Sequence, residues 1–301
     1  MVIPNTLRRR PKSGRLLPAA GEFLFVLPVL ALLAVTVVLP TLQVLFHAFT
    51  DWQPGYHSEW VGFDNFAERF SSDSFWQVLR NQAFLLLGLP IWILTPLALA
   101  FLLHEGVPRA GLYRAIYFFP AIAPPSLIGI LFAMLLQPQG LINSVLRSVG
   151  LGGLAQDWLT SEQLVKPVLI VVLAWATVGT GVVIFSAALS AVPTDQFEAA
   201  RLDGASWRQR LWHVALPSIR GTVELWSVIL VVIVFTGIFP WIYTLTRGGP
   251  GYSSSTLDWD IYQNSLQFGY YGTAAAEVVI MLALVVVVVV LGALLTRRSR
   301  R

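Results

Sequence analysis

Hydrophobic and polar residues alternate in long blocks along this chain. Six apolar stretches, each long enough to cross a bilayer as a helix, occupy residues 23–49, 78–103, 115–137, 167–191, 222–245 and 273–295. Prolines at positions 120, 124 and 125 interrupt the third stretch, so we expect it to kink or to unwind locally. The pattern predicts an all-α polytopic membrane protein whose transmembrane domain, residues 22–296, has six helices.

One long polar block lies in the second half of the chain, at residues 193–220, and we call it the polar segment. It carries seven charged residues. Its apolar residues nevertheless keep the helical spacing i, i+4, i+7 and i+8: Trp207, Leu211, Val214 and Ala215. This spacing predicts an amphipathic helix that docks one face against another part of the protein.

A shorter helix is expected before the amphipathic one. Thr194 or Asp195 is a suitable N-cap for it, and Asp195 with Glu198 three residues later has the spacing of a capping box. Gly204 is expected to break the chain between the two helices, because glycine allows a sharp change of direction. Pro217 is expected to close the second helix. The polar segment is therefore predicted to be a compact pair of helices between two membrane spans.

Composition supports the membrane interpretation. Of the 301 residues, 56% are hydrophobic and 12% are charged, and the mean hydropathy is +0.69. Soluble domains have about 25% charged residues. The chain has no cysteine, and its four histidines are not spaced as metal ligands: His47, His57, His104 and His213. We expect no disulfide and no metal site, and we attribute the net charge of +4 to membrane topology rather than to nucleic acid binding.

The distribution of basic residues predicts the orientation. Fifteen lysines and arginines lie on the side that holds the basic segment 1–21, the polar segment and the tail 297–301, and five lie on the other side. By the positive-inside rule both termini and the polar segment are expected in the cytoplasm. Residues 50–77 carry five acidic residues and a single basic one, Arg69, together with several aromatic residues, which is typical of an outer segment.

The catalytic motifs of common enzymes are missing from the sequence. It has no G-x-x-x-x-G-K-[ST] loop for nucleotide phosphates, no G-x-S-x-G turn and no H-E-x-x-H pair. We expect that this chain is not an enzyme, that it does not hydrolyse ATP and that it binds no cofactor.

The polar segment contains a spaced signature between residues 198 and 217. Glu198-Ala199-Ala200, then Gly204, Val214 and Leu216-Pro217 resemble the EAA motif, E-A-A-x3-G-x9-I-x-L-P, of permease subunits of bacterial binding-protein-dependent ABC importers. Val214 departs from the usual isoleucine but keeps a β-branched apolar side chain. WVGFDNF at 60–66, FFPAIAPP at 118–125 and LTRGGPGYSSSTL at 245–257 look like the carbohydrate-type subfamily. The resemblance covers the chain from the first span to the last.

The resemblance implies a mechanism and a set of partners. In this family the EAA segment forms coupling helices that sit in a cleft of the ATPase subunit, so that closure on ATP turns the membrane helices from inward-open to outward-open. It implies a type I importer fold in the bacterial inner membrane, a second homologous permease, two cytoplasmic ATPase subunits that hold ATP and Mg²⁺, and an extracytoplasmic solute-binding protein. The positions that it assigns to ATPase coupling are Glu198, Ala199, Ala200, Asp203, Gly204, Val214, Leu216 and Pro217.

The resemblance also implies a substrate class, which is a sugar or an oligosaccharide. Glycerol phosphate or its diesters are the alternative, because related permeases carry them. A stand-alone secondary transporter or channel is a different class of interpretation, and it predicts buried ionisable pairs or a repeat of broken helices, which the sequence does not make evident. A membrane-embedded enzyme would need reactive groups that converge at one membrane depth.

Polar and aromatic residues inside the spans are the candidates for a substrate pathway. Glu224 is expected to reach the membrane interface, and Glu277 is either an interfacial carboxylate or part of the pathway or of a subunit contact. Trp241 belongs to an aromatic group that is more typical of an interfacial belt. The candidate pathway residues are Asn81, Thr236, Trp241 and Glu277.

Overall fold

The computed structural model describes residues 20–298, in two compact units divided after Phe46. The predicted basic ends therefore lie almost entirely outside the described residues. The first unit contains α1 (Ala20–Leu33), a π-helical turn η1 (Ala34–Val38) and most of α2 (Leu39–His47). Together they make an apolar helix over Phe25–His47 that is long enough to cross a membrane, which agrees with the first predicted span.

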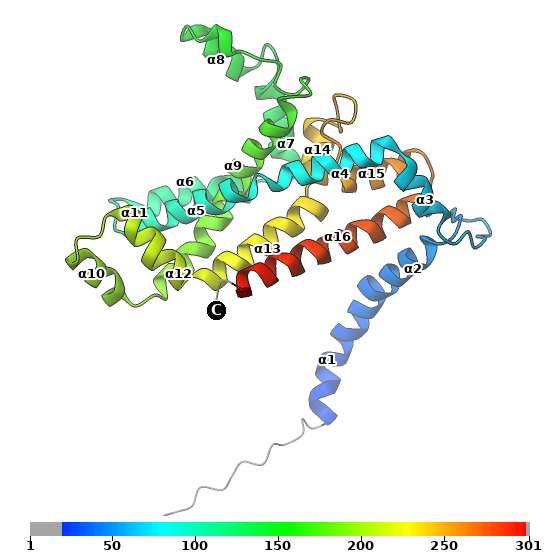
Figure 1. Cartoon of the computed structure of the whole chain (residues 1–301), viewed down its shortest axis with the longest axis horizontal. Coiled ribbons are helices and arrows are strands. Elements are labelled where there is room, and N and C mark those ends of the chain that lie inside the picture. The colour runs from blue at the N-terminus through cyan, green and yellow to red at the C-terminus, as the bar shows by residue number, and fades with distance from the viewer. Residues whose placement is uncertain (1–19, 299–301) are drawn as a thin grey trace, which may run out of the picture. The chain divides into compact units, whose positions relative to one another are not determined.

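In the described residues of the second unit the regular secondary structure is helical, apart from one isolated bridge between Thr50 and Trp60 (Figure 1). The first half contains α3 (Asp64–Ser71), α4 (Asp73–Leu86), α5 (Leu89–His104), α6 (Ala110–Ile122), α7 (Pro125–Leu135), α8 (Leu141–Ser148) and η2 (Gly152–Leu154). The second half contains α9 (Val165–Ser190), α10 (Thr194–Leu202), α11 (Trp207–Arg210), η3 (Leu211–Ala215), α12 (Leu216–Ser218), α13 (Arg220–Thr236), α14 (Phe239–Leu245), α15 (Leu257–Tyr262), η4 (Gln263–Gln267) and α16 (Tyr271–Arg298).

Four helical stretches in the described residues are long and apolar enough to span a bilayer, and the number rises to six if each of two bent helix pairs counts as one span. One of the four is the continuous stretch Asp73–His104, formed by α4 and α5. The bent pair α6–α7 turns by 96° beside Pro124 and Pro125. The predicted break in the third span is thereby confirmed. Its cause is that a proline lacks a backbone N–H and disfavours helical dihedral angles at the residue before it.

Helix α9 forms the centre of the packing, with α5 and α6 against it. Small residues make this approach possible. A Cβ atom at Gly179 would overlap the backbone carbonyl of Tyr117 in α6, and one at Gly181 would overlap the ring of Pro96 in α5. Membrane helices associate through such close van der Waals contact, because lipid tails are as apolar as leucine and give little hydrophobic drive between helices.

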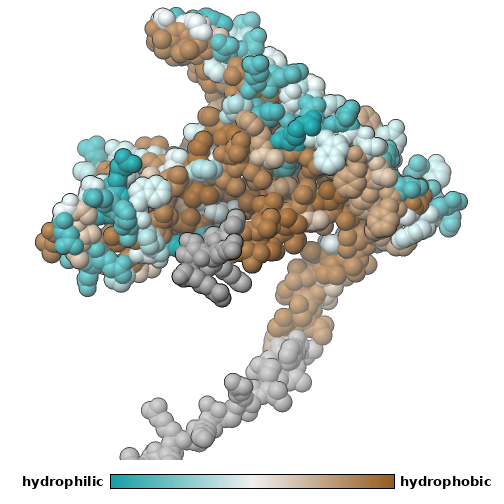
Figure 2. All heavy atoms as spheres, viewed as in Figure 1, coloured by the Kyte–Doolittle hydropathy of each residue, from teal (hydrophilic) through white to brown (hydrophobic). Residues whose placement is uncertain are grey.

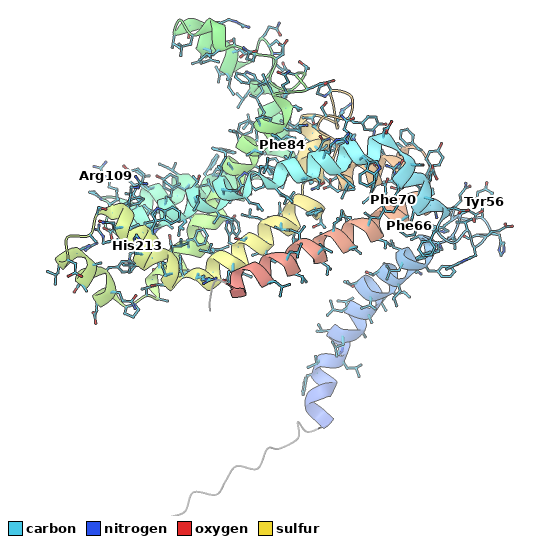
Figure 3. All side chains as sticks on the ribbon, in the orientation of Figure 1. Tyr56, Phe66, Phe70, Phe84, Arg109 and His213 are labelled. Atoms are coloured by element: carbon cyan, nitrogen blue, oxygen red, sulfur yellow. The ribbon has the colours of Figure 1, made fainter. Side chains whose placement is uncertain are left out.

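Hydrophobic residues cover the middle of the second unit and polar residues gather at its ends (Figure 2). Many large apolar side chains are exposed on these helices, including Leu102, Val183 and Val286. Exposed leucine and valine in such numbers suit a surface in contact with lipid. Figure 3 shows Tyr56, Phe66 and Phe70 at the end of the bundle opposite to Arg109 and His213. The polar segment lies at the same end as Arg109, and we call the other end the far end.

Candidate functional site

The first helix of the polar segment, α10, begins directly after Pro193, which occupies the N-cap position without a side-chain hydrogen bond. The predicted cap by Thr194 or Asp195 is therefore wrong, and so is the capping box with Glu198. Thr194 and Asp195 already lie in the first helical turn, where a carboxylate is favourable beside the positive end of the helix dipole. The Glu198 side chain is left exposed.

Gly204 ends this helix with a left-handed conformation, φ +76°. Its amide donates to the carbonyl of Arg201 at 3.0 Å, and the amide of Ala205 donates to the carbonyl of Ala200 at 2.9 Å. These two bonds form a Schellman motif, which satisfies the last carbonyls of the helix and needs a positive φ at one residue. The predicted break at Gly204 is confirmed, and its physical cause is the φ value rather than crowding, because a Cβ there would meet nothing within 4 Å.

The second helix starts with a capping box formed by Ser206 and Gln209, which we did not predict. It runs through α11, η3 and α12 and ends at Ser218, one residue beyond the predicted stop at Pro217, before the chain bends by 81° into α13. Pro217 lies one residue before the end of this helix, directly after the π-helical turn η3 and Leu216.

The apolar face of the second helix packs against the end of α5, as the spacing predicts. Leu211 and Ala215 are buried. The rings of Phe101 in α5 and Trp207 lie 5.5 Å apart, and Phe101 also lies 5.9 Å from Phe197 of α10. The face that the sequence marks for docking is therefore occupied by the chain itself, and a partner protein has to use other residues.

Glu105, the residue directly after α5, forms ion pairs with both helices of the polar segment. Its carboxylate accepts from Nη2 of Arg210 at 2.5 Å and from Nε at 3.4 Å, and it lies 3.2 Å from Nη2 of Arg201. Burial alone would raise the pKa of Glu105, but the hydrogen bonds and charges of Arg210 and Arg201 outweigh it and lower the pKa. The pairs therefore stabilise the fold at neutral pH, and this contribution is lost as the pH falls through that lowered pKa.

The short helix α10 and its turn form one exposed part of the polar segment. Leu202 is 88% exposed, which is unusual for leucine at a hydrophilic end of the protein. The positions predicted for ATPase coupling fall into two groups. Glu198, Ala199, Asp203, Gly204 and Pro217 are exposed, and Ala200, Val214 and Leu216 are half-buried against the body of the protein. The short helix α10 is thus exposed on one side and packs on the other side against α5, through Phe197 and Phe101.

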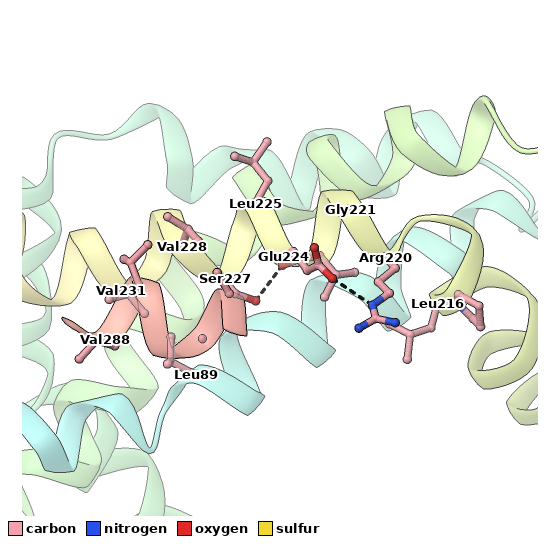
Figure 4. A pocket seen from close by; sticks show the side chains of 15 residues that line it. Leu89, Leu216, Arg220, Gly221, Glu224, Leu225, Ser227, Val228, Val231 and Val288 are labelled. Atoms are coloured by element: carbon pink, nitrogen blue, oxygen red, sulfur yellow. Dashed lines mark hydrogen bonds and ion pairs between the residues drawn. The ribbon is translucent and has the colours of Figure 1, made fainter. Parts of the chain in front are cut away.

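A groove with a volume of about 870 Å³ opens beside the polar segment, between α13 and α16 (Figure 4). Leu216 and Pro217 form part of its wall, so the groove and the segment share residues. Its ionisable lining residues are Arg220 and Glu224, which pair at 2.9 Å. Glu224 is thus one partner of an ion pair beside an apolar groove.

Two adjacent amide side chains on α4, those of Asn81 and Gln82, connect several segments of the chain by hydrogen bonds. Asn81 donates to the carbonyls of Tyr252 and Ser255 at 2.6 and 3.0 Å, and its oxygen accepts from Lys166 at 3.2 Å. Gln82 donates to the carbonyl of Val234 at 2.5 Å and accepts from the amide of Leu257 at 3.1 Å. These bonds fix residues 246–257 and the end of α13 to the second span.

Glu277 belongs to a buried charged group that we call the Arg69 cluster, made of Arg69, Asp260, Asn264 and Glu277. Glu277 is fully buried, pairs with Arg69 and accepts from Asn264 at 2.9 Å. Glu277 is therefore enclosed by protein, with the guanidinium of Arg69 from α3 against its carboxylate. In the sequence, Arg69 stands out only as the single basic residue of the acidic segment 50–77.

The four candidate pathway residues are not gathered in one place. Asn81 and Glu277 are buried in the networks described above, and Trp241 is buried in the core. Thr236 is exposed and its hydroxyl donates to the carbonyl of Val232 at 2.9 Å. None of the four lines the groove beside α13 or the smaller cavity near Trp158. Their role in a pathway stays a prediction.

Comparison with known proteins identifies the class of this chain. Residues 66–301 match the family described as the binding-protein-dependent transport system inner membrane component. The chain belongs to this family. It is accordingly a membrane permease component of a binding-protein-dependent system, and the resemblance based on the EAA motif is confirmed.

Individual relatives agree with this family. The chain is 33% identical to the diacetylchitobiose uptake system permease protein NgcF of Streptomyces coelicolor, over 80% of this chain and 73% of the relative. It is 29% identical to the sn-glycerol-3-phosphate transport system permease protein UgpA of Shigella flexneri, over 81% of this chain and 83% of the relative.

The same fold occurs in a solved structure. A chain from the crystal structure of a bacterial ABC transporter involved in the import of the acidic polysaccharide alginate superimposes with a TM-score of 0.81, covering 92% of this chain and 95% of that one at 24% identity. This likeness shows the fold, which is the all-α polytopic fold of an ABC importer permease.

Proposed function

We propose that this chain is the transmembrane permease subunit of an ATP-driven importer for a sugar or an oligosaccharide, and that the polar segment couples it to the ATPase. The observation that carries the proposal is α10, a short exposed helix ended by the Schellman turn at Gly204 and backed by α5. A helix fixed in this way passes a displacement to the spans instead of absorbing it. Glu198 offers a charged anchor, and Ala199 allows close approach of a partner.

The proposed assembly contains a second homologous permease, two ATPase subunits in the cytoplasm and a solute-binding protein on the outside. ATP and Mg²⁺ bind to the ATPase subunits, and this chain holds no cofactor. Both termini, the polar segment and the adjacent groove lie on the cytoplasmic side, with the far end outside. The excess of basic residues on the side of the polar segment supports this orientation.

The preference for a sugar over glycerol phosphate takes the groove between α13 and α16 as part of the substrate pathway. Its ionisable lining residues are Arg220 and Glu224, which are paired with each other. An anionic phosphate ester would require basic groups free to bind it. The permease UgpA keeps glycerol phosphate as the alternative, and NgcF, whose name refers to a disaccharide, supports the sugar.

A stand-alone secondary transporter is the competing class, and the Arg69 cluster is the buried ionisable group that it requires. The family match and the fold argue against it. Within the cluster the guanidinium of Arg69 already pairs with both carboxylates, which suits a fixed structural role.

The test is uptake by the complete system. The permease pair, the ATPase and the binding protein are reconstituted in proteoliposomes, after a thermal-shift screen of the binding protein against sugars and polyol phosphates has identified the solute. We expect Glu198→Ala and Gly204→Val to abolish ATP-dependent uptake while membrane insertion stays intact, and Asp195→Asn on the same helix to be tolerated. Full uptake by both motif variants would refute the coupling assignment.

A further inference from the structure

One carboxylate bridges the two halves of the polar segment. Arg201 lies in the last turn of α10 and Arg210 at the end of α11, on opposite sides of the Gly204 turn. Both guanidinium groups pair with Glu105, and Arg210 also donates to the carbonyl of Ala205 at 2.5 Å. The side chains of Glu105 and Arg210 are 12% and 14% exposed, so water screens this pair weakly.

Glu105 is fixed to the second span. It is the C-cap of α5, and its amide donates to the carbonyl of Phe101 at 3.0 Å. Because the carboxylate follows the end of α5 directly, the ion pairs join α10 and α11 to the stretch Asp73–His104. The other end of this stretch carries Asn81 and Gln82, which hold residues 246–257.

We propose that Glu105 is a positioning residue for coupling, which sets the angle between α10 and α11 and passes a displacement of α10 into the second span. This inference rests on the proposed function of the polar segment and extends it to a residue outside the EAA motif. Two contacts from Arg210 to one carboxylate fix direction as well as distance, which a single point charge does not do.

The ion pairs and the apolar packing have separable effects. Leu211 and Ala215 are buried, and the contact of Trp207 with Phe101 does not involve Glu105. Without the carboxylate, the second helix keeps this packing and Phe197 of α10 stays against Phe101, whereas the last turn of α10 loses the ion pair that ties it to α5. The expected defect is therefore loss of coupling in a folded protein. ATP hydrolysis continues, and fewer solute molecules are imported for each ATP.

The experiment measures imported solute per hydrolysed ATP in the reconstituted importer. Variants Glu105→Gln and Arg210→Gln are compared with their double variant and with Glu105→Asp, which keeps the charge. Arg208→Gln, an exposed arginine on the same helix, is the matched control. We expect the ratio to fall about fivefold or more in both single variants, to fall no further in the double variant and to recover partly in Glu105→Asp.

Two further readouts make each outcome decisive. The variants should keep the melting temperature of the control within a few degrees and should still co-purify with the ATPase subunits. The proposal is overturned if the Glu105 and Arg210 variants import as much solute per hydrolysed ATP as Arg208→Gln does. It is also overturned if these variants unfold or lose the ATPase subunits, because either loss would by itself explain a lower ratio. If the unmodified importer neither binds the ATPase nor transports, the proposed function itself fails, and the role of Glu105 fails with it.

Discussion

The guanidinium of Arg69 lies 2.6 Å from a carboxylate oxygen of Asp260, a residue 191 positions later in the chain. It also pairs with Glu277, so that one cation in α3 faces acidic residues from α15 and α16. This contact fastens the helix that follows the first span to the last span. It lies at the end of the bundle opposite to the polar segment, where we propose that the solute-binding protein docks.

Replacing Arg69 with methionine should destabilise the protein strongly. The two carboxylates would remain buried without a cation, and removing one partner of a buried ion pair costs ~3–5 kcal/mol. The measurement is the thermal unfolding of the purified protein in detergent. Arg80→Met, at an exposed arginine of α4, is the control. Equal melting temperatures for the two variants would show that the Arg69 cluster contributes nothing.

Replacing Gln82 with leucine should loosen residues 246–257. The change leaves the carbonyl of Val234 and the amide of Leu257 without their side-chain partner, at ~1–3 kcal/mol for each buried group. We expect faster hydrogen exchange in residues 246–257, with little change in α9. Gln267→Leu, at an exposed glutamine, should leave the exchange pattern as it is. Unaltered exchange in residues 246–257 of the Gln82 variant would contradict the assigned contacts.

Replacing Gly179 with alanine should disturb the packing of α6 on α9. The new methyl group would overlap the carbonyl of Tyr117, and a backbone atom has no side-chain rotamer by which to move away. Gly221→Ala in α13 is the matched control, because its Cβ would meet nothing within 4 Å. A melting temperature for Gly179→Ala at or above that of the control would rule out close packing at this crossing.

Asp258 should make stability depend on pH. Burial of its carboxylate raises its pKa from 3.8 to about 6, although Thr256 and the amide of Trp259 donate to it. Because the folded protein favours the neutral acid, stability should fall as the pH rises through this range, by at most ~3 kcal/mol. Asp258→Asn should remove this fall between pH 4 and pH 7. Stability is measured from unfolding curves of Asp258→Asn and of the exposed control Asp157→Asn. If the stability of both variants depends on pH in the same way, the burial argument is contradicted.

The sequence was sufficient to predict the membrane-spanning helices and to identify the EAA motif. Hydrophobic length predicted the membrane helices, Pro124 and Pro125 marked the bend between α6 and α7, and Gly204 marked the turn in the polar segment. The cap of α10 was predicted wrongly, because acidic residues are favoured both at the N-cap and in the first turn, and pattern alone does not separate the two positions.

The ion pairs could not be predicted from the pattern. Glu105 pairs with Arg210 105 positions later, and Arg69 pairs with Asp260 191 positions later. Only the fold brings such residues together, and periodicity carries no information about it. The distribution of charged residues did give a weak indication of both ion pairs. Arg69 is the single base in an acidic segment, and Glu105 is an acid in a short loop on the same predicted side as the basic polar segment.

The central claim is that α10 contacts the ATPase subunit, and site-directed photo-crosslinking tests it directly. The chain has no cysteine, so a single introduced cysteine is its one site for a maleimide probe. Leu202→Cys, at the exposed end of α10, is compared with Leu141→Cys on α8, which is 61% exposed and lies away from the polar segment (Figure 1). Each purified permease variant is labelled with a benzophenone maleimide before the other subunits are added, and the assembled importer is then irradiated. The account predicts a crosslink to the ATPase from position 202 and none from position 141, and the reverse result would contradict it.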